Sequence, residues 1–270
     1  MVKDLNELVT KLKVAAGANL KSVVLYGSAA TGEFHPKHSD LNVLCILERV
    51  DGSALEQLNP ATVWWARKGH PAPLVFSAEE LRSAADVFSI EFADIKVGHK
   101  VLFGDDLFKS LEVPMRLHRE QVERELRNNL VRLRQHYLAA PGDDKALLEL
   151  MTESVSSFTT LFRHALIALG DSAPHRPLPQ KQDALWGQPQ SGELKRRAVD
   201  RLASLFGFDP SGFHTVFDVR EGKQPRNLID VRSTFRAYLE AVTRVTQAVD
   251  QKLGELSNSS AAGPLSEPGA

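Results

Sequence analysis

Apolar positions in the N-terminal part of the chain follow both helical and strand spacing, which predicts a mixed segment up to about residue 113. A helical stripe opens the chain, and strands are predicted over 20–26 and 40–47. The second strand is an almost unbroken apolar run, typical of a strand covered on both faces. The remaining predicted elements are a helix over 53–68, a short strand over 74–76, a short helix after Ser77, a strand over 87–95 and a turn at 104–106.

The pattern changes after Pro114, where apolar residues recur every three or four positions. This spacing predicts four amphipathic helices, at about 122–137, 148–169, 194–206 and 228–249. Four such helices with short connections predict a helical bundle. The proline-rich interval 171–190 is predicted to be an ordered crossing loop. The stretch 254–270, rich in Ser, Gly, Pro and Ala, is predicted to be a disordered tail.

These elements together predict an α+β chain, with a sheet and its flanking helices followed by an all-α bundle. The expected domain boundaries are 1–113 for the sheet domain, 114–253 for the bundle and 254–270 for the tail.

Composition narrows the function classes without choosing one. The 270 residues include 33 basic and 34 acidic side chains, so the net charge of -1 gives no reason to expect bulk binding to nucleic acid. Cys45 is the one cysteine, so a disulfide framework and a cysteine-rich zinc site are excluded. It lies in an apolar run. No apolar window of about 18 residues and no signal peptide is visible. We therefore expect no membrane partner and a cytoplasmic setting.

The candidate chemistry lies where the first predicted strand ends. Gly27 and Ser28 follow that strand, and a short helix is expected next. Glycine permits the bend, and amides at a helix N-terminus suit an anion such as phosphate. Asp40 and Asn42 stand two residues apart in the next predicted strand, so they should project from one face. An acid that opens an apolar strand is unusual and points to a ligand shared with Ser28.

This pattern resembles that of the nucleotidyltransferase superfamily, in which an apolar residue, Gly and Ser precede an Asp-x-Asp or Asp-x-Glu strand. The resemblance is strongest to aminoglycoside adenylyltransferases, in which a domain of this size precedes a helical bundle. The motif covers residues 20–47, and the order of elements extends the resemblance to about residue 110.

The resemblance implies transfer of a nucleoside monophosphate from a nucleoside triphosphate, with ATP the first candidate, to a hydroxyl of a small molecule or protein. It implies that Gly27 and Ser28 hold the terminal phosphates and that Asp40 binds Mg²⁺. It also implies a third acid on a later strand. Glu91 is the candidate, as a metal ligand or as the base that takes the proton of the acceptor hydroxyl.

Position 42 departs from the family pattern, because an active member carries a second acid there. The Asn42 amide oxygen can bind Mg²⁺ but adds no negative charge, so a second metal should bind more weakly. Three outcomes follow from this difference: slow catalysis with one metal, replacement by another acid such as Asp94, or a nucleotide-binding or partner-binding homologue without catalysis.

Two further positions have competing interpretations. If 87–95 is a strand with Ile90 and Phe92 facing the core, Glu91 lies on the opposite face and Asp94 on the apolar side, which favours Glu91. Lys37 lies between Ser28 and Asp40. It belongs either to a solvated polar loop or to the groups that hold phosphate.

Overall fold

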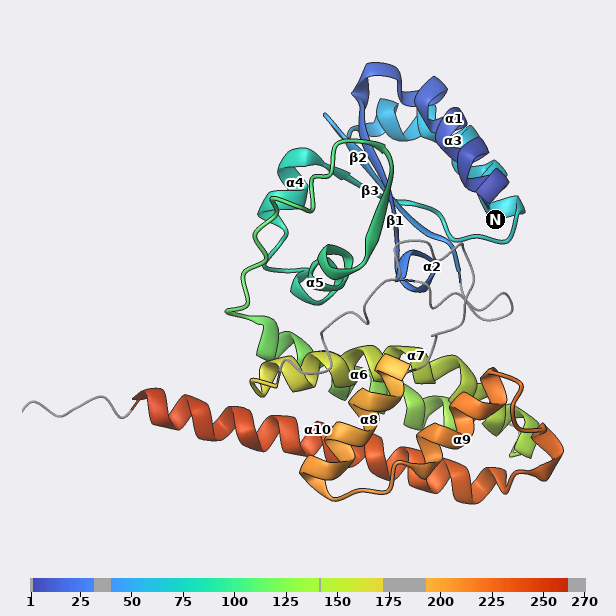
Figure 1. Ribbon diagram of the computed structural model, residues 1–270, viewed down its shortest axis with the longest axis vertical. Helices are drawn as coiled ribbons and strands as arrows, with labels where there is room; N and C mark the ends of the chain where they lie inside the picture. The colour runs from blue at the N-terminus through green and yellow to red at the C-terminus, as the bar shows by residue number, and fades with distance from the viewer. Residues whose placement is uncertain (1, 32–39, 141, 172–192, 262–270) are drawn as a thin grey trace, which may run out of the picture. The chain divides into compact units, whose positions relative to one another are not determined.

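The computed structural model describes residues 2–31, 40–140, 142–171 and 193–261, with the side chains of the last helix described up to Gln251. The chain divides into two compact units (Figure 1). We call the described residues up to His118 the sheet unit and those from Arg119 onward the helical unit. The predicted α+β class is confirmed.

One four-stranded mixed sheet, in the order β3-β2-β1-β4, forms the centre of the sheet unit. Its strands are β1 (Leu20–Tyr26), β2 (Asn42–Leu47), β3 (Leu74–Ser77) and β4 (His99–Gly104). β1 is antiparallel to both β2 and β4, whereas β2 and β3 are parallel. Because of this pairing, the end of β1 meets the start of β2 and the start of β4 at one end of the sheet.

Helices cover both faces of the sheet (Figure 1). On one face, α1 (Val2–Ala16) and α3 (Gly52–Arg67) share a core with Val23, Leu25 and Cys45. On the other face, α4 (Ala78–Ser83) and α5 (Ser89–Val97) pack on the side chains of alternate positions, among them Val24 and Leu44. This double coverage explains why β2 is apolar at nearly every position.

Two predictions about this unit are wrong in detail, and one strand was missed. Strand β2 begins at Asn42, so Asp40 precedes the strand rather than opening it. The segment predicted as a strand over 87–95 is largely the helix α5. A core facing α5 buries Phe92 and Ile95, which are three residues apart as on a helix. The edge strand β4 was not predicted.

Five helices form the helical unit, one more than predicted. They are α6 (His118–Ala139), α7 (Asp144–Ala168), α8 (Glu193–Phe206), α9 (Ser211–Arg220) and α10 (Val231–Ala261). α7 packs against α8, α9 and α10, as the bundle prediction required. α10 continues to Ala261, into the stretch predicted as a tail. The predicted crossing loop at 171–190 lies outside the described residues, apart from Asp171.

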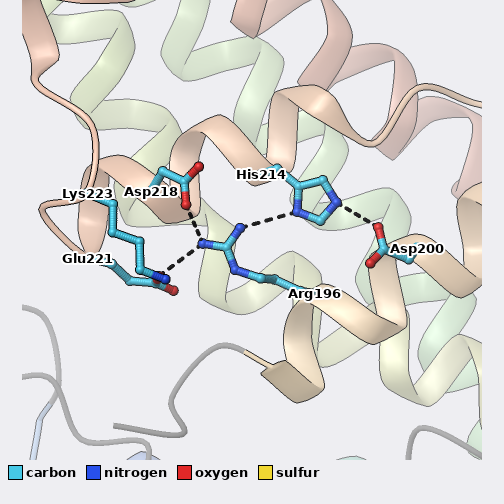
Figure 2. A network of polar contacts seen from close by, with 6 residues as sticks. All are labelled: Arg196, Asp200, His214, Asp218, Glu221 and Lys223. Carbon is cyan, nitrogen blue, oxygen red and sulfur yellow. Dashed lines mark hydrogen bonds and ion pairs between the residues drawn. The ribbon is translucent and has the colours of Figure 1, made fainter.

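A polar network joins α8 to α9 (Figure 2). Arg196 on α8 donates to Asp218 (2.8 Å) and to Glu221 (3.0 Å). His214 on α9 lies between Arg196 and Asp200, with its Nε2 2.6 Å from the Asp200 carboxylate. A ring nitrogen that faces a guanidinium acts as an acceptor, so Nε2 carries the proton and donates to Asp200. The positive charge of Arg196 lies next to the negative charges of Asp218 and Glu221, which is typical of a contact that stabilises the fold.

No helix within the described part of the chain is long and apolar enough to cross a membrane.

Candidate functional site

The candidate site begins at the bend that follows β1. Gly27 has a φ of +73°, in the left-handed region that favours glycine. A Cβ added to Gly27 would lie 3.1 Å from Nδ2 of Asn42. The β1–β2 register places Asn42 directly opposite Tyr26. The structure therefore brings Gly27 and Asn42 together at one end of the sheet.

Ser28 opens the short helix α2 (Ser28–Thr31), as the sequence predicted. The Gly27 carbonyl accepts hydrogen bonds from the amides of Ala30 (2.9 Å) and Thr31 (3.2 Å), which closes the turn. The leading amides of a helix have no partner within it. Those of Ser28 and Ala29 therefore lie outside the hydrogen bonds of this turn. Helix α2 also meets the end of α5, since a Cβ on Gly98 would clash with the Thr31 side chain.

Asp40 is exposed and lies two residues before Asn42. Its charge acts on His70, whose pKa is lowered by partial burial while the charges of Asp4 and Asp40 oppose that change. The His70 ring packs on Trp65 of α3, with ring centroids 4.2 Å apart. Asp40 is therefore within electrostatic reach of the His70 ring, which follows the end of α3. Because Asp40 lies outside β2, strand alternation does not fix the direction of its side chain.

Glu91 lies in the first turn of α5 rather than on a strand, and it is exposed. It acts on Tyr26 at the end of β1: burial raises the pKa of the Tyr26 hydroxyl, and the negative charge of Glu91 raises it further. Asp94, the alternative acid, lies three residues later on the same helix and is half-buried. The strand-alternation argument that separated these two acids does not apply to a helix.

A row of polar residues crosses the sheet at this end. Asn42, Tyr26 and His99 are directly opposite one another on β2, β1 and β4. Directly opposite residues share a face of the sheet, and this row lies on the α5 side. The next row on the same face, formed by Leu44, Val24 and Val101, is apolar. Neither Tyr26 nor His99 was among the residues predicted from sequence. Finding them required the β1–β4 pairing.

His99 is held between two acceptors. Its Nδ1 lies 2.7 Å from the carbonyl oxygen of Ile95, and its Nε2 lies 2.9 Å from Oδ1 of Asp106. The β1–β4 register places this ring, in contact with Asp106, directly opposite Tyr26.

The donor atoms available to a metal are limited. Among the described residues, no group of three His, Cys, Asp or Glu side chains could hold a metal ion. None of the four strands of the sheet contains an Asp or a Glu. Within the described residues, no strand therefore carries the third acid that the family resemblance implies, and Glu91 lies on the helix α5. Lys37 lies outside the described residues.

The fold is similar to that of a nucleotidyltransferase. No protein-family model and no curated protein matches the sequence. Among solved structures, the chain is similar to spectinomycin adenyltransferase AAD(9) from Enterococcus faecialis, which was solved with ATP and spectinomycin. The match covers 91% of this chain and 99% of that chain, with a TM-score of 0.51 and 14% identity. At this identity the likeness concerns the fold, and function must be argued from the site.

Proposed function

We propose that this protein is a nucleotidyltransferase that moves a nucleoside monophosphate from a nucleoside triphosphate, ATP first, to a hydroxyl group. The acceptor is a small molecule or a protein side chain, and a small molecule is the first to test because the structural neighbour was solved with ATP and spectinomycin. The reaction uses Mg²⁺.

The observation that carries this proposal is the junction at the end of β1. A left-handed glycine, a serine at a helix start and the Asn42 amide come together there. Small residues and helix-start amides let a phosphate approach the backbone closely. The adenyltransferase-like fold supports the same interpretation independently of the motif.

The site residues have distinct roles in this proposal. Gly27 and Ser28 hold the terminal phosphates, and Lys37 adds a positive charge to them. Asp40, Asn42 and Glu91 offer carboxylate and amide oxygens, the ligand type that Mg²⁺ prefers. When bound, the metal neutralises charge on the reacting phosphate. Glu91 also serves as the base for the acceptor hydroxyl.

The proposed ligands carry enough negative charge to hold one Mg²⁺ ion well, but not two. Asp40 and Glu91 supply two negative charges, and Asn42 supplies none. Phosphoryl transfer depends largely on positioning and electrostatic stabilisation, so a missing charge should slow the reaction without changing its type.

The test is transfer of label from α-phosphate-labelled ATP to spectinomycin in the presence of Mg²⁺. We expect a labelled acceptor with the natural protein and loss of most labelling with Asp40→Asn. Asp105→Asn, which removes an exposed acid of the same unit outside the site, is the matched control. If ATP binds, as measured by calorimetry, but no label reaches spectinomycin, other acceptors or the protein itself, catalytic transfer is rejected.

The second candidate function is a nucleotide-binding homologue with weak or no catalysis, acting as a regulatory or partner-binding module. Asn42 and the lack of strand acids favour it. Asn42→Asp separates the two candidates. A large gain of transfer would show that the natural site lacks a needed charge. An unchanged rate with intact ATP binding would show that the site works with the amide in place.

A further inference from the structure

The connection from α5 to β4 forms a corner beside the proposed phosphate-binding bend. α5 ends one residue before Gly98 and β4 begins one residue after it, so this residue makes the corner. The Gly98 amide donates to the Asp94 carbonyl (3.0 Å), which continues the hydrogen bonding of the helix up to the corner. His99 then lies directly opposite Tyr26, the residue that precedes Gly27. The strand pairing therefore places the corner next to the bend.

The His99 ring holds this corner in place. Its Nδ1 lies 2.7 Å from the carbonyl oxygen of Ile95, in the last turn of α5, where carbonyl groups have no partner within the helix. Its Nε2 lies 2.9 Å from Oδ1 of Asp106, and the same oxygen accepts from the Lys109 amide (3.1 Å). The ring also packs on the buried Phe108, with ring centroids 5.5 Å apart. The corner is therefore attached both to the end of α5 and to the loop after β4.

Gly98 is in close contact with Thr31, the last residue of α2. A Cβ added to Gly98 would overlap with Cγ2 of Thr31. The φ of Gly98 is −145°, outside the left-handed region, so the backbone at this position does not require glycine. The lack of a side chain at position 98 therefore matters because of the space that the Thr31 methyl group occupies.

Thr31 in turn contacts the bend. Its amide (3.2 Å) and its hydroxyl (3.4 Å) both lie near the Gly27 carbonyl, and the hydroxyl is also 3.4 Å from the Ser28 carbonyl. The methyl and the hydroxyl of threonine are attached to the same Cβ, and its χ1 angle is restricted. A displaced methyl group therefore also displaces the hydroxyl. One side chain thus contacts the corner at one end and the bend at the other.

We propose that Thr31 is a positioning residue: its methyl group packs on Gly98, and through this contact the α5–β4 corner sets the position of the Gly27–Ser28 bend. This inference rests on the proposed binding of ATP at the bend, which both candidate functions include. Backbone groups that surround a phosphate must approach it closely, so a small displacement of the bend weakens binding.

The test moves one methyl group from position 31 to position 98 of the full chain. Gly98→Ala should weaken ATP binding, measured by calorimetry with Mg²⁺, by about tenfold, because overpacking displaces the Thr31 side chain. Thr31→Ser keeps the hydroxyl but leaves a gap at the corner, and should weaken binding by about two- to threefold. The double variant should regain most of the natural affinity, since the new Cβ then lies 3.7 Å from the Cβ of residue 31.

Gly52→Ala is the matched control. Gly52 lies in the same unit, has no positive φ and has nothing within 4 Å of an added Cβ. This variant should bind ATP with the natural affinity. Urea denaturation of all four variants gives their stability and confirms that each is folded in the binding assay.

The cycle separates positioning from a purely structural contact. A structural contact would lower the urea midpoint of Gly98→Ala and leave the ATP affinity of the folded protein unchanged, which overturns the proposal. A loss of affinity that the double variant does not regain also overturns it, because the loss then has another route. If Gly98→Ala alone does not fold, a lower affinity in Thr31→Ser that returns in the double variant supports the proposal, and a natural affinity in Thr31→Ser overturns it.

The same measurements distinguish this inference from the proposed function. Natural protein that binds no ATP rejects the proposed function and the inference with it. The expected cycle of affinities in a protein that transfers no label supports the inference together with the second candidate function. ATP binding that none of these variants changes overturns the inference and leaves the proposed function standing.

Discussion

Gly27 combines two constraints in one residue. Its left-handed φ disfavours any residue with a Cβ, and a Cβ there would lie only 3.1 Å from the Asn42 amide nitrogen. Gly69 has a similar φ of +86° but nothing within 4 Å of a Cβ. The two positions therefore differ in their surroundings and not in their backbone strain.

We expect Gly27→Ala to lose about 1–2 kcal/mol of stability, the usual cost of a left-handed alanine, and also to weaken ATP binding by displacing Asn42. Gly69→Ala should lose similar stability and keep ATP affinity. Urea denaturation and calorimetry measure the two effects. Equal ATP affinity in both variants would show that the 27–42 contact does not shape the site.

Asp106 gives a prediction about pH. Burial works to raise the pKa of Asp106, but the hydrogen bond and the charge of His99 help to bring it below its ordinary value of 3.8. A carboxylate with a lowered folded pKa stabilises the protein above the unfolded pKa and loses that effect as pH falls through the folded value. The stability difference between the natural protein and Asp106→Asn should therefore be full above pH 3.8 and shrink below it. Urea midpoints across this range measure it, and a constant difference would contradict the ion pair.

Among the elements, α4 has a start that could be predicted because its signal is local. Ser77 Oγ accepts from the Glu80 amide (3.0 Å), and the Glu80 carboxylate accepts from the Ser77 amide (2.7 Å). The two residues of this capping box are only three positions apart in the sequence. The helix needs no distant contact to define its start.

Ser77→Ala should destabilise the sheet unit by about 0.5–2 kcal/mol, because it leaves the Glu80 amide without its cap. Ser83→Ala, at the other end of the same helix, is the control, since its hydroxyl is exposed and makes only a 3.4 Å contact to the Glu80 carbonyl. Denaturant midpoints should fall for the first variant and barely change for the second. An equal loss in both would argue against the capping box.

α5 shows why other elements could not be predicted. In the stretch 89–93, the buried Ile90 and Phe92 are two residues apart, which satisfies strand alternation, whereas the helical spacing is seen only when Ile95 is included with Phe92. The Phe92 amide donates to the Phe88 carbonyl (2.9 Å), which is a helical hydrogen bond and not one between strands. The strand that pairs with β1 on this side of the sheet is β4, which follows α5 in the sequence.

At the scale of the whole molecule, the sheet separates two cores, and Cys45 is fully buried in one of them. Burial raises the pKa of the Cys45 thiol to about 12. The thiolate is the reactive form of cysteine. Little thiolate is present at neutral pH and the side chain is buried, so both features protect Cys45 from thiol reagents.

Cys45 should therefore report on unfolding of the sheet unit. We expect the folded protein to react with a thiol reagent at neutral pH far more slowly than free glutathione does. The rate should rise with denaturant together with the loss of circular dichroism. Because the chain has a single cysteine, the signal has one source. Rapid labelling of the folded protein would contradict the burial of β2.

The features that could be predicted from the sequence depend on neighbouring residues: the Gly27-Ser28 bend, the α4 cap, the apolar strand β2 and most of the helical unit. Two relations became visible only in the folded chain: Glu91 lies on a helix, and Asn42, Tyr26 and His99 form one row. These relations depend on strand pairing between segments far apart in the chain, and a local hydrophobic pattern carries no record of which strand lies beside which.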